Sequence, residues 1–125
     1  MAGIICADTL QDGAGNSTAM DNAIYGSAKA WVTFNGVTTT TILASYSISS
    51  VTRNSAGNYT VNFTNAFVDA NYVVVCSAST GASDLRAAYP NFSTAPATSS
   101  CQIVTMNTTG TTQYDTNYVR AAFFR

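Results

Sequence analysis

The sequence predicts an all-β fold, an antiparallel β-sandwich or a small barrel, and three observations support this prediction. Apolar residues make up 46% of the 125 residues and charged residues only 9%, against about 25% in ordinary soluble domains. Thr, Ser and Asn replace the charges, and these residues favour strands and turns over helices. Short stretches of alternating polar and apolar residues follow one another with turn signals between them, as in sandwiches and barrels.

The first 27 residues differ from the rest, and we interpret them as an N-terminal arm. They are polar and Gly-rich without steady periodicity. The alternative is a partly disordered terminus. A few apolar side chains in the arm are candidates for attachment to a partner: Ile4, Ile5, Leu10, Ile24 and Tyr25.

Three strands are expected between residues 29 and 64. In the first, residues 29–35, Trp31 and Thr33 share one face while Val32 and Phe34 share the other. The second, residues 42–49, alternates apolar and small polar residues, and residues 53–58 form a hairpin loop. The third has the clearest alternation, with Tyr59, Val61 and Phe63 on one face.

Two further strands, residues 72–79 and 117–125, are apolar on both faces over part of their length. A two-layer sandwich buries one face of each sheet, so such strands need a third layer, either the arm or another subunit. We therefore expect a homo-oligomer. The residues expected at its interface are Tyr72, Val74, Cys76, Phe123 and Phe124. The alternative is that these strands are central in a small barrel, because short apolar runs are ambiguous.

Two irregular stretches, residues 80–99 and 107–117, are candidate recognition loops, since loops carry recognition more often than strands do. The alternative is that they are ordinary connections. The candidate binding residues in them are Tyr89, Asn91, Phe92, Gln113, Tyr114 and Asp115.

Composition argues against catalysis and against most kinds of ligand. The chain has no His and no Glu, so neither a Ser-His-Asp triad nor a histidine metal site can be built. No cofactor motif is present, so no cofactor is expected. With a net charge of −1 and no basic run, nucleic-acid binding is not expected. No stretch is long and apolar enough for membrane insertion. Three widely spaced cysteines fit buried, reduced thiols, and a bridge between Cys76 and Cys101 has no sequence support.

Trp31 has two interpretations. With Tyr25 or Tyr89 it would form an aromatic platform for a sugar ring. A Trp in the middle of an alternating strand is more often part of a core or an interface, and we favour that interpretation.

Three segments resemble a domain of bacteriophage tail-fibre proteins: "GSAKAWVTFNG", "ILASYSISSVTRNSAGNYTVNFTNAFVDANYVV" and the closing "VRAAFFR". The similarity is dense over residues 26–76 and loose over residues 77–117. It implies a virion protein whose β-structured knob is trimeric and contacts polysaccharide or protein on the host surface. No binding residue carries over from the resemblance to a position of this sequence.

In the resembling proteins a long shaft precedes the knob, whereas about 26 residues precede it here. The expectation is therefore that the arm docks the knob directly on the particle, through contacts with other virion proteins. Host recognition at the tail is the first expected role, and capsid decoration or a head fibre is the alternative. A polysaccharide depolymerase is the least favoured. No secretory signal is recognised, so synthesis in the host cytoplasm and location in the virion are expected.

Overall fold

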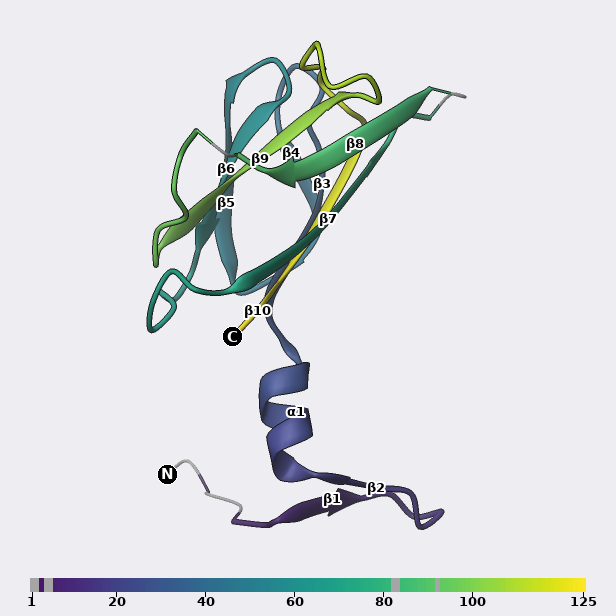
Figure 1. Ribbon diagram of the computed structural model, residues 1–125, viewed down its shortest axis with the longest axis vertical. Coiled ribbons are helices and arrows are strands. Elements are labelled where there is room, and N and C mark those ends of the chain that lie inside the picture. Colours follow the sequence, from purple (N-terminus) through teal and green to yellow (C-terminus); the bar gives the residue numbers. More distant parts are fainter. Residues whose placement is uncertain (1–2, 4–5, 82–83, 92) are drawn as a thin grey trace.

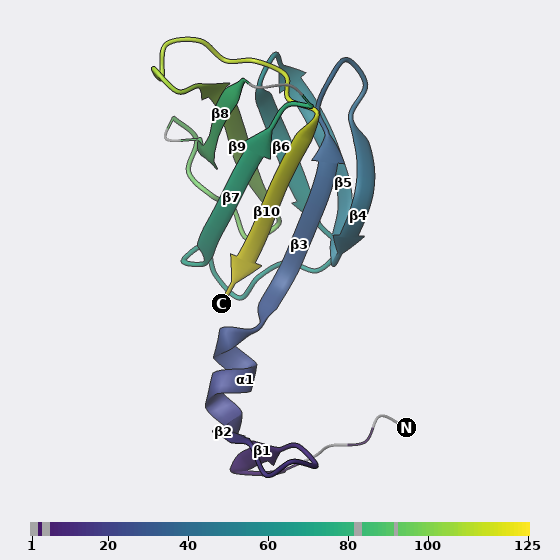
Figure 2. The same ribbon diagram turned by 90° about the vertical axis from the view of Figure 1, so that its right-hand side faces the viewer.

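The chain forms a barrel-like body with a projecting N-terminal arm (Figures 1 and 2). The computed structural model describes residue 3 and residues 6–81, 84–91 and 93–125. The arm contains β1 (Thr9–Gln11), β2 (Ser17–Ala19) and α1 (Met20–Gly26). The barrel strands are β3 (Ala28–Asn35), β4 (Thr41–Tyr46), β5 (Ile48–Ser55), β6 (Asn58–Phe63), β7 (Val73–Ser79), β8 (Leu85–Pro90), β9 (Ser100–Asn107) and β10 (Tyr118–Phe124). The prediction of an antiparallel all-β fold is confirmed.

The eight barrel strands form one sheet that folds over into two layers. Its strand order is β4-β3-β10-β7-β8-β9-β6-β5. In Figure 2, β7, β10, β3 and β4 lie in front of β8, β9, β6 and β5, and we call these the first and second layers. Among the described residues, the pairs Ala78–Arg86 and Ser79–Leu85 join the layers between β7 and β8. At the other edge the chain itself passes from β4 to β5 at Ser47. The fold is therefore a sandwich that is nearly closed into a barrel.

The core lies between the two layers and is formed by alternate residues of the central strands. Phe34, Tyr59 and Phe123 are fully buried there. Phe63 makes edge-to-face contacts with Phe67, Tyr72 and Phe123, with ring centroids 4.7, 5.6 and 4.9 Å away. Such pairs each add about 0.5–1.5 kcal/mol beyond the burial of their area. The aromatic contacts therefore join β6 of the second layer to β10 of the first.

The structure corrects three expectations about the elements. The expected strand 42–49 is interrupted at Ser47, whose φ of 57° places it in the left-handed region. The expected hairpin loop 53–58 is tighter, because β5 continues to Ser55 and β6 starts at Asn58. The stretch 80–99, expected to be irregular, contains β8, whose residues pair with both β7 and β9. Its sequence, LRAAYP, lacks the alternation by which strands are recognised.

The apolar residues of β7 and β10 are divided between the core and the outer surface. Tyr72 and Phe123 are buried in the core, and Val74 and Cys76 pack against it. Five residues were expected at a subunit interface. Of these, only the partly exposed Phe124 has its side chain on the outer surface. The outward apolar residues of β7 are Val73 and Val75. The homo-oligomer remains a prediction.

Neighbouring residues on β10 provide a test of this division. Replacing the fully buried Phe123 with Ala leaves a cavity between the layers and is expected to lower the free energy of unfolding by about 3–5 kcal/mol. The matched variant Phe124→Ala removes the same atoms from the outer face, and we expect a loss of about 1 kcal/mol or less. Urea unfolding at low protein concentration measures both. Equal losses would show that β10 is not oriented as described.

Candidate functional site

The distal end of the barrel, opposite the arm, is formed by the turns at residues 36–40 and 55–58 and by the loop at residues 107–117 (Figure 1). These three segments come from distant parts of the sequence. Strands β3, β5, β6, β9 and β10 bring them together because each of these strands starts or ends at this edge. A surface here is presented away from the arm.

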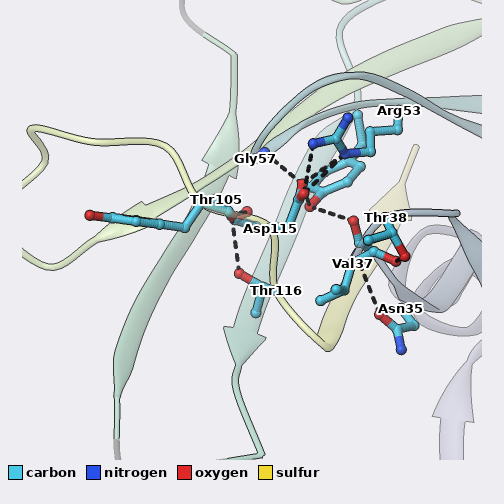
Figure 3. A network of polar contacts seen from close by, with 11 residues as sticks. Asn35, Val37, Thr38, Arg53, Gly57, Thr105, Asp115 and Thr116 are labelled. Carbon is cyan, nitrogen blue, oxygen red and sulfur yellow. Dashed lines mark hydrogen bonds and ion pairs between the residues drawn. The ribbon is translucent and has the colours of Figure 1, made fainter.

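The carboxylate of Asp115 joins the segments of the distal end (Figure 3). Arg53 Nε donates to Asp115 Oδ1 at 3.0 Å, and Arg53 Nη2 donates to Oδ2 at 2.7 Å. The backbone N–H of Gly57 and the hydroxyl of Tyr59 also donate to Oδ1, at 3.0 and 2.9 Å. Because the carboxylate oxygens are acceptors only, all of these donors favour the ionised form.

The surroundings of Asp115 fix the protonation states in this network. The hydrogen bonds from Arg53 hold the pKa of the Asp115 carboxyl below its ordinary value of 3.8. Burial, followed by the hydrogen bond to Asp115, raises the pKa of Tyr59 to about 12. At neutral pH the phenol therefore keeps its proton and donates it, while the carboxylate stays charged.

Two glycines allow the close approach of these segments. A Cβ on Gly36 would lie 2.3 Å from the hydroxyl oxygen of Tyr59. Gly57 has a φ of 67°, and a Cβ there would lie 2.5 Å from the carbonyl oxygen of Thr105 and 2.6 Å from the backbone nitrogen of Tyr114. Both contacts leave no room for a side chain, so the hairpin between β5 and β6 packs directly on the 107–117 loop.

Hydrogen bonds within the loop and to Thr105 of β9 hold the 107–117 loop in place. Asn107 Oδ1 accepts from the backbone N–H groups of Thr111 and Thr112 at 3.0 and 3.2 Å. The backbone N–H of Tyr114 donates to the Thr105 carbonyl at 3.1 Å, and Thr105 Oγ1 donates to the Tyr114 carbonyl at 2.6 Å. These bonds hold Tyr114 in place. The centroid of its exposed ring lies 4.7 Å from the guanidinium carbon of Arg86. The loop thus presents a Tyr–Arg pair in a fixed position.

The structure does not bring the six candidate binding residues together. Gln113, Tyr114 and Asp115 lie in the distal loop, but Asp115 serves the network just described. Tyr89 lies on β8, where its hydroxyl contacts the Met106 sulfur. Asn91 follows the same strand and donates to Gln102 Oε1 at 2.7 Å. Phe92 lies outside the described residues.

A second candidate surface is the outer face of the first layer, for which the sequence reasoning named Trp31 but not Tyr46 or Val75. Strand register places Tyr46, Trp31, Ala122 and Val75 in one row across β4, β3, β10 and β7. The side chains of Trp31, Tyr46 and Val75 are 40%, 58% and 58% exposed. Trp31 therefore lies outside the core, so the expectation of a core position is wrong and the interface position stays a prediction. Val32 and Phe34 on the same strand are buried in the core. We call this row, together with Arg120 in the next row, the outer face.

The arm has almost no core of its own. Leu10, Ile24 and Tyr25, which were predicted to make attachments, are all about half exposed or more. Ile4 and Ile5, predicted for the same role, lie outside the described residues. None of the described residues of the arm is buried. Burial of apolar side chains normally offsets the entropic cost of ordering a segment. The described residues of the arm bury none, so their apolar side chains stay available to a partner.

Other features provide no chemical site within the described residues. The cysteines described at positions 6, 76 and 101 are free. Burial, and secondarily Cys101, raises the pKa of the Cys76 thiol to about 12. The described part of the chain has no group of three or more metal-ligating side chains. None of the helices described in it is long and apolar enough to cross a membrane. Comparisons of the chain with protein-family models, curated proteins and solved structures find no match.

Removing the charge of Asp115 tests the network. Asp115→Asn loses the charge-assisted bonds to Arg53, and we expect the free energy of unfolding at pH 7 to fall by about 2 kcal/mol. Ionised Asp115 stabilises the fold above its ordinary pKa, and this stabilisation is lost as pH falls through its lower pKa in the folded state. Urea unfolding at pH 7 and below pH 3 should therefore show a difference between wild type and variant that shrinks on acidification. A pH-independent difference would contradict the account.

Gly57 and Gly110 form a matched pair for testing the close approach. Both have positive φ, 67° and 71°, but nothing lies within 4 Å of a Cβ on Gly110. Gly110→Ala is expected to cost about 1 kcal/mol for the backbone conformation alone. Gly57→Ala adds contacts with backbone atoms and is expected to cost at least about 2 kcal/mol more. Thermal unfolding compares the two, and equal costs would exclude the proposed packing of hairpin on loop.

Proposed function

We propose that this chain is a bacteriophage virion structural protein, a short tail-fibre-like knob that takes part in recognising the host surface. The observation that carries the proposal is the placement of two different surfaces at opposite ends of the molecule (Figure 1). The unburied arm is suited to attachment to other virion proteins, and the anchored distal loops are suited to contact with another surface. The sequence resemblance to tail-fibre knobs points in the same direction.

The chemistry of the distal end favours a glycan or a protein as the bound partner. Tyr114 offers an exposed ring held in place by Arg86 and by the Thr105 backbone. The rest of the loop, NTTGTTQ, offers amides and hydroxyls rather than charges. An aromatic face beside neutral hydrogen-bonding groups suits a sugar ring or a polar protein surface, and a preorganised loop loses little entropy on binding.

Binding is favoured over catalysis by the states of the reactive groups. The Asp115 carboxylate is neutralised by Arg53. Asp69 forms an ion pair with Arg125, and Asp84 forms a longer one with Arg86, at 3.3 Å. A depolymerase acting through carboxylates needs two of them placed on either side of a glycosidic bond. The paired carboxylates of the barrel do not suit that role.

Capsid decoration is a second candidate, and the outer face is the observation that favours it. Capsid decoration would use the exposed row of Trp31, Tyr46 and Val75 on the first layer, together with the unburied arm, because exposed apolar patches mark surfaces that bind other proteins. In that case the broad side of the barrel, rather than its distal end, would meet the particle.

Adsorption of the purified protein to a panel of bacterial strains and their surface polysaccharides tests the first candidate. We expect Tyr114→Ser to lower binding about tenfold or more, since aromatic residues dominate binding hot spots. Tyr89→Ser is the matched control because it removes an aromatic ring from β8 rather than from the 107–117 loop. Loss of binding in the control alone would overturn the assignment to the distal end, and release of reducing sugar would indicate a depolymerase.

The position in the particle separates the two roles. Cryo-electron microscopy of virions carrying the protein is expected to show it at the tail, with its arm inward and residues 107–117 outward. Density at positions related by capsid symmetry would exclude the tail-fibre role and support decoration.

A further inference from the structure

We propose that the outer face binds the N-terminal arm of a second copy of this chain, so that the protein assembles head to tail. The inference does not depend on the proposed host recognition, because it concerns surfaces remote from the distal loops. It rests on the composition of the two surfaces, on their charges and on the way the arm is held.

The outer face combines apolar side chains with one cation, Arg120, that has no acidic partner among the described residues. A shallow depression lies between β3, β10 and β7, and Trp31, Val75, Ser77, Arg120 and Ala122 contribute to its lining. Among the described residues, the ion pairs of the barrel use Arg53, Arg86 and Arg125. Arg120 donates to Ser79 Oγ at 3.2 Å and lies over the Tyr118 ring, but it is not among these pairs.

The arm carries the complementary charges. Residues 1–27 contain three Asp and no Lys or Arg, whereas residues 28–125 contain five cations and three Asp, so the arm has a charge of −3 and the barrel +2. Asp12 is engaged with Asn16 inside the arm. Asp8 and Asp21 instead line one hollow together with Met20 and Ile24. Two carboxylates beside apolar side chains match Arg120 beside Trp31 and Val75.

The arm is directed away from its own barrel, so the arm that binds the outer face has to come from a second molecule. Only Ser27 separates α1 from β3. Lys29 Nζ donates to the carbonyl of Ile24 in the last turn of α1 and to Ser27 Oγ at 3.2 Å. These bonds hold the helix as a continuation of the strand, beyond the end of the barrel (Figure 2). Folding back on the outer face of the same chain would break them.

Charge also distinguishes arm docking from direct packing of two outer faces. A symmetric contact between outer faces that is centred on β10 places Arg120 close to its own copy, and like charges in a contact are unfavourable. Arm docking gives each Arg120 an acidic partner, and a head-to-tail contact closes into a ring when its rotation allows. The observations therefore favour the arm as the occupant.

Sedimentation velocity on the full chain at micromolar concentration tests the proposal. We expect a mass of at least two chains, and of three 13.1 kDa chains for a closed trimeric ring. Arg120→Glu should raise the dissociation constant about tenfold or more, and adding Asp8→Lys and Asp21→Lys should restore most of the affinity. Circular dichroism checks that each variant is folded. A monomeric wild type, or tighter assembly of Arg120→Ser, would overturn the proposal.

A cross-linking experiment tests the contact without disturbing the charges. Cys6 lies in the same hollow of the arm as Asp8 and Asp21, and Ser77 pairs with Arg120 across the strands. Under mild oxidation, Ser77→Cys is expected to form an intermolecular disulfide with Cys6, and adding Cys6→Ser should abolish it. Thr52→Cys, exposed on the second layer, is the matched control. Equal yields at positions 52 and 77 would overturn the proposal.

Discussion

The ionised carboxylate of Asp115 is the interaction on which the distal end of the barrel depends. It joins Arg53 on β5, the hairpin at Gly57 and the hydroxyl of Tyr59, whose ring is buried in the core. The loop that carries Asp115, which leads into β10 of the first layer, is thereby fixed to β5 and β6 of the second layer. Because Gly57 leaves no space for a side chain, the backbones of hairpin and loop meet directly. The ten residues between β9 and β10 thus become part of the barrel, and the side chains they present are held in place.

The alternation of the strands decides which surfaces remain for partners. Each inward residue of β3, β7 and β10 fills the space between the layers, and each outward neighbour remains on the surface. Because β7 and β10 are apolar on both faces, the outer face keeps Val75 and Ala122 beside Trp31. The arm, which gains little burial from its own barrel, has the charges that this face lacks. Folding of one chain therefore leaves the described residues of the arm and the apolar side chains of the outer face exposed.

Sequence alone was sufficient for the fold class and for the best-patterned strands, such as β6, where Tyr59, Val61 and Phe63 are all buried. It was insufficient where the structure depends on contacts between residues far apart in the sequence. Alternation shows that Trp31 and Thr33 share a face, but not that this face is outside. β8 is held by pairing on both sides rather than by its own pattern. Arg53 and Asp115 are 62 residues apart, so no local signal identifies their contact. Asp115 was therefore expected to bind a partner, although its carboxylate is used within the fold.

Amide hydrogen exchange at Gly57 and Tyr114, followed by NMR at neutral pH, tests the central role of Asp115 most directly. Both amides donate within the network, to Asp115 Oδ1 and to the Thr105 carbonyl. If the carboxylate anchors the loop, they should exchange as slowly as the amide of Ile103 in β9, since all three would open only with the barrel. Exchange as fast as that of an exposed loop amide, with Ile103 still protected, would show that the loop moves independently and would contradict the account.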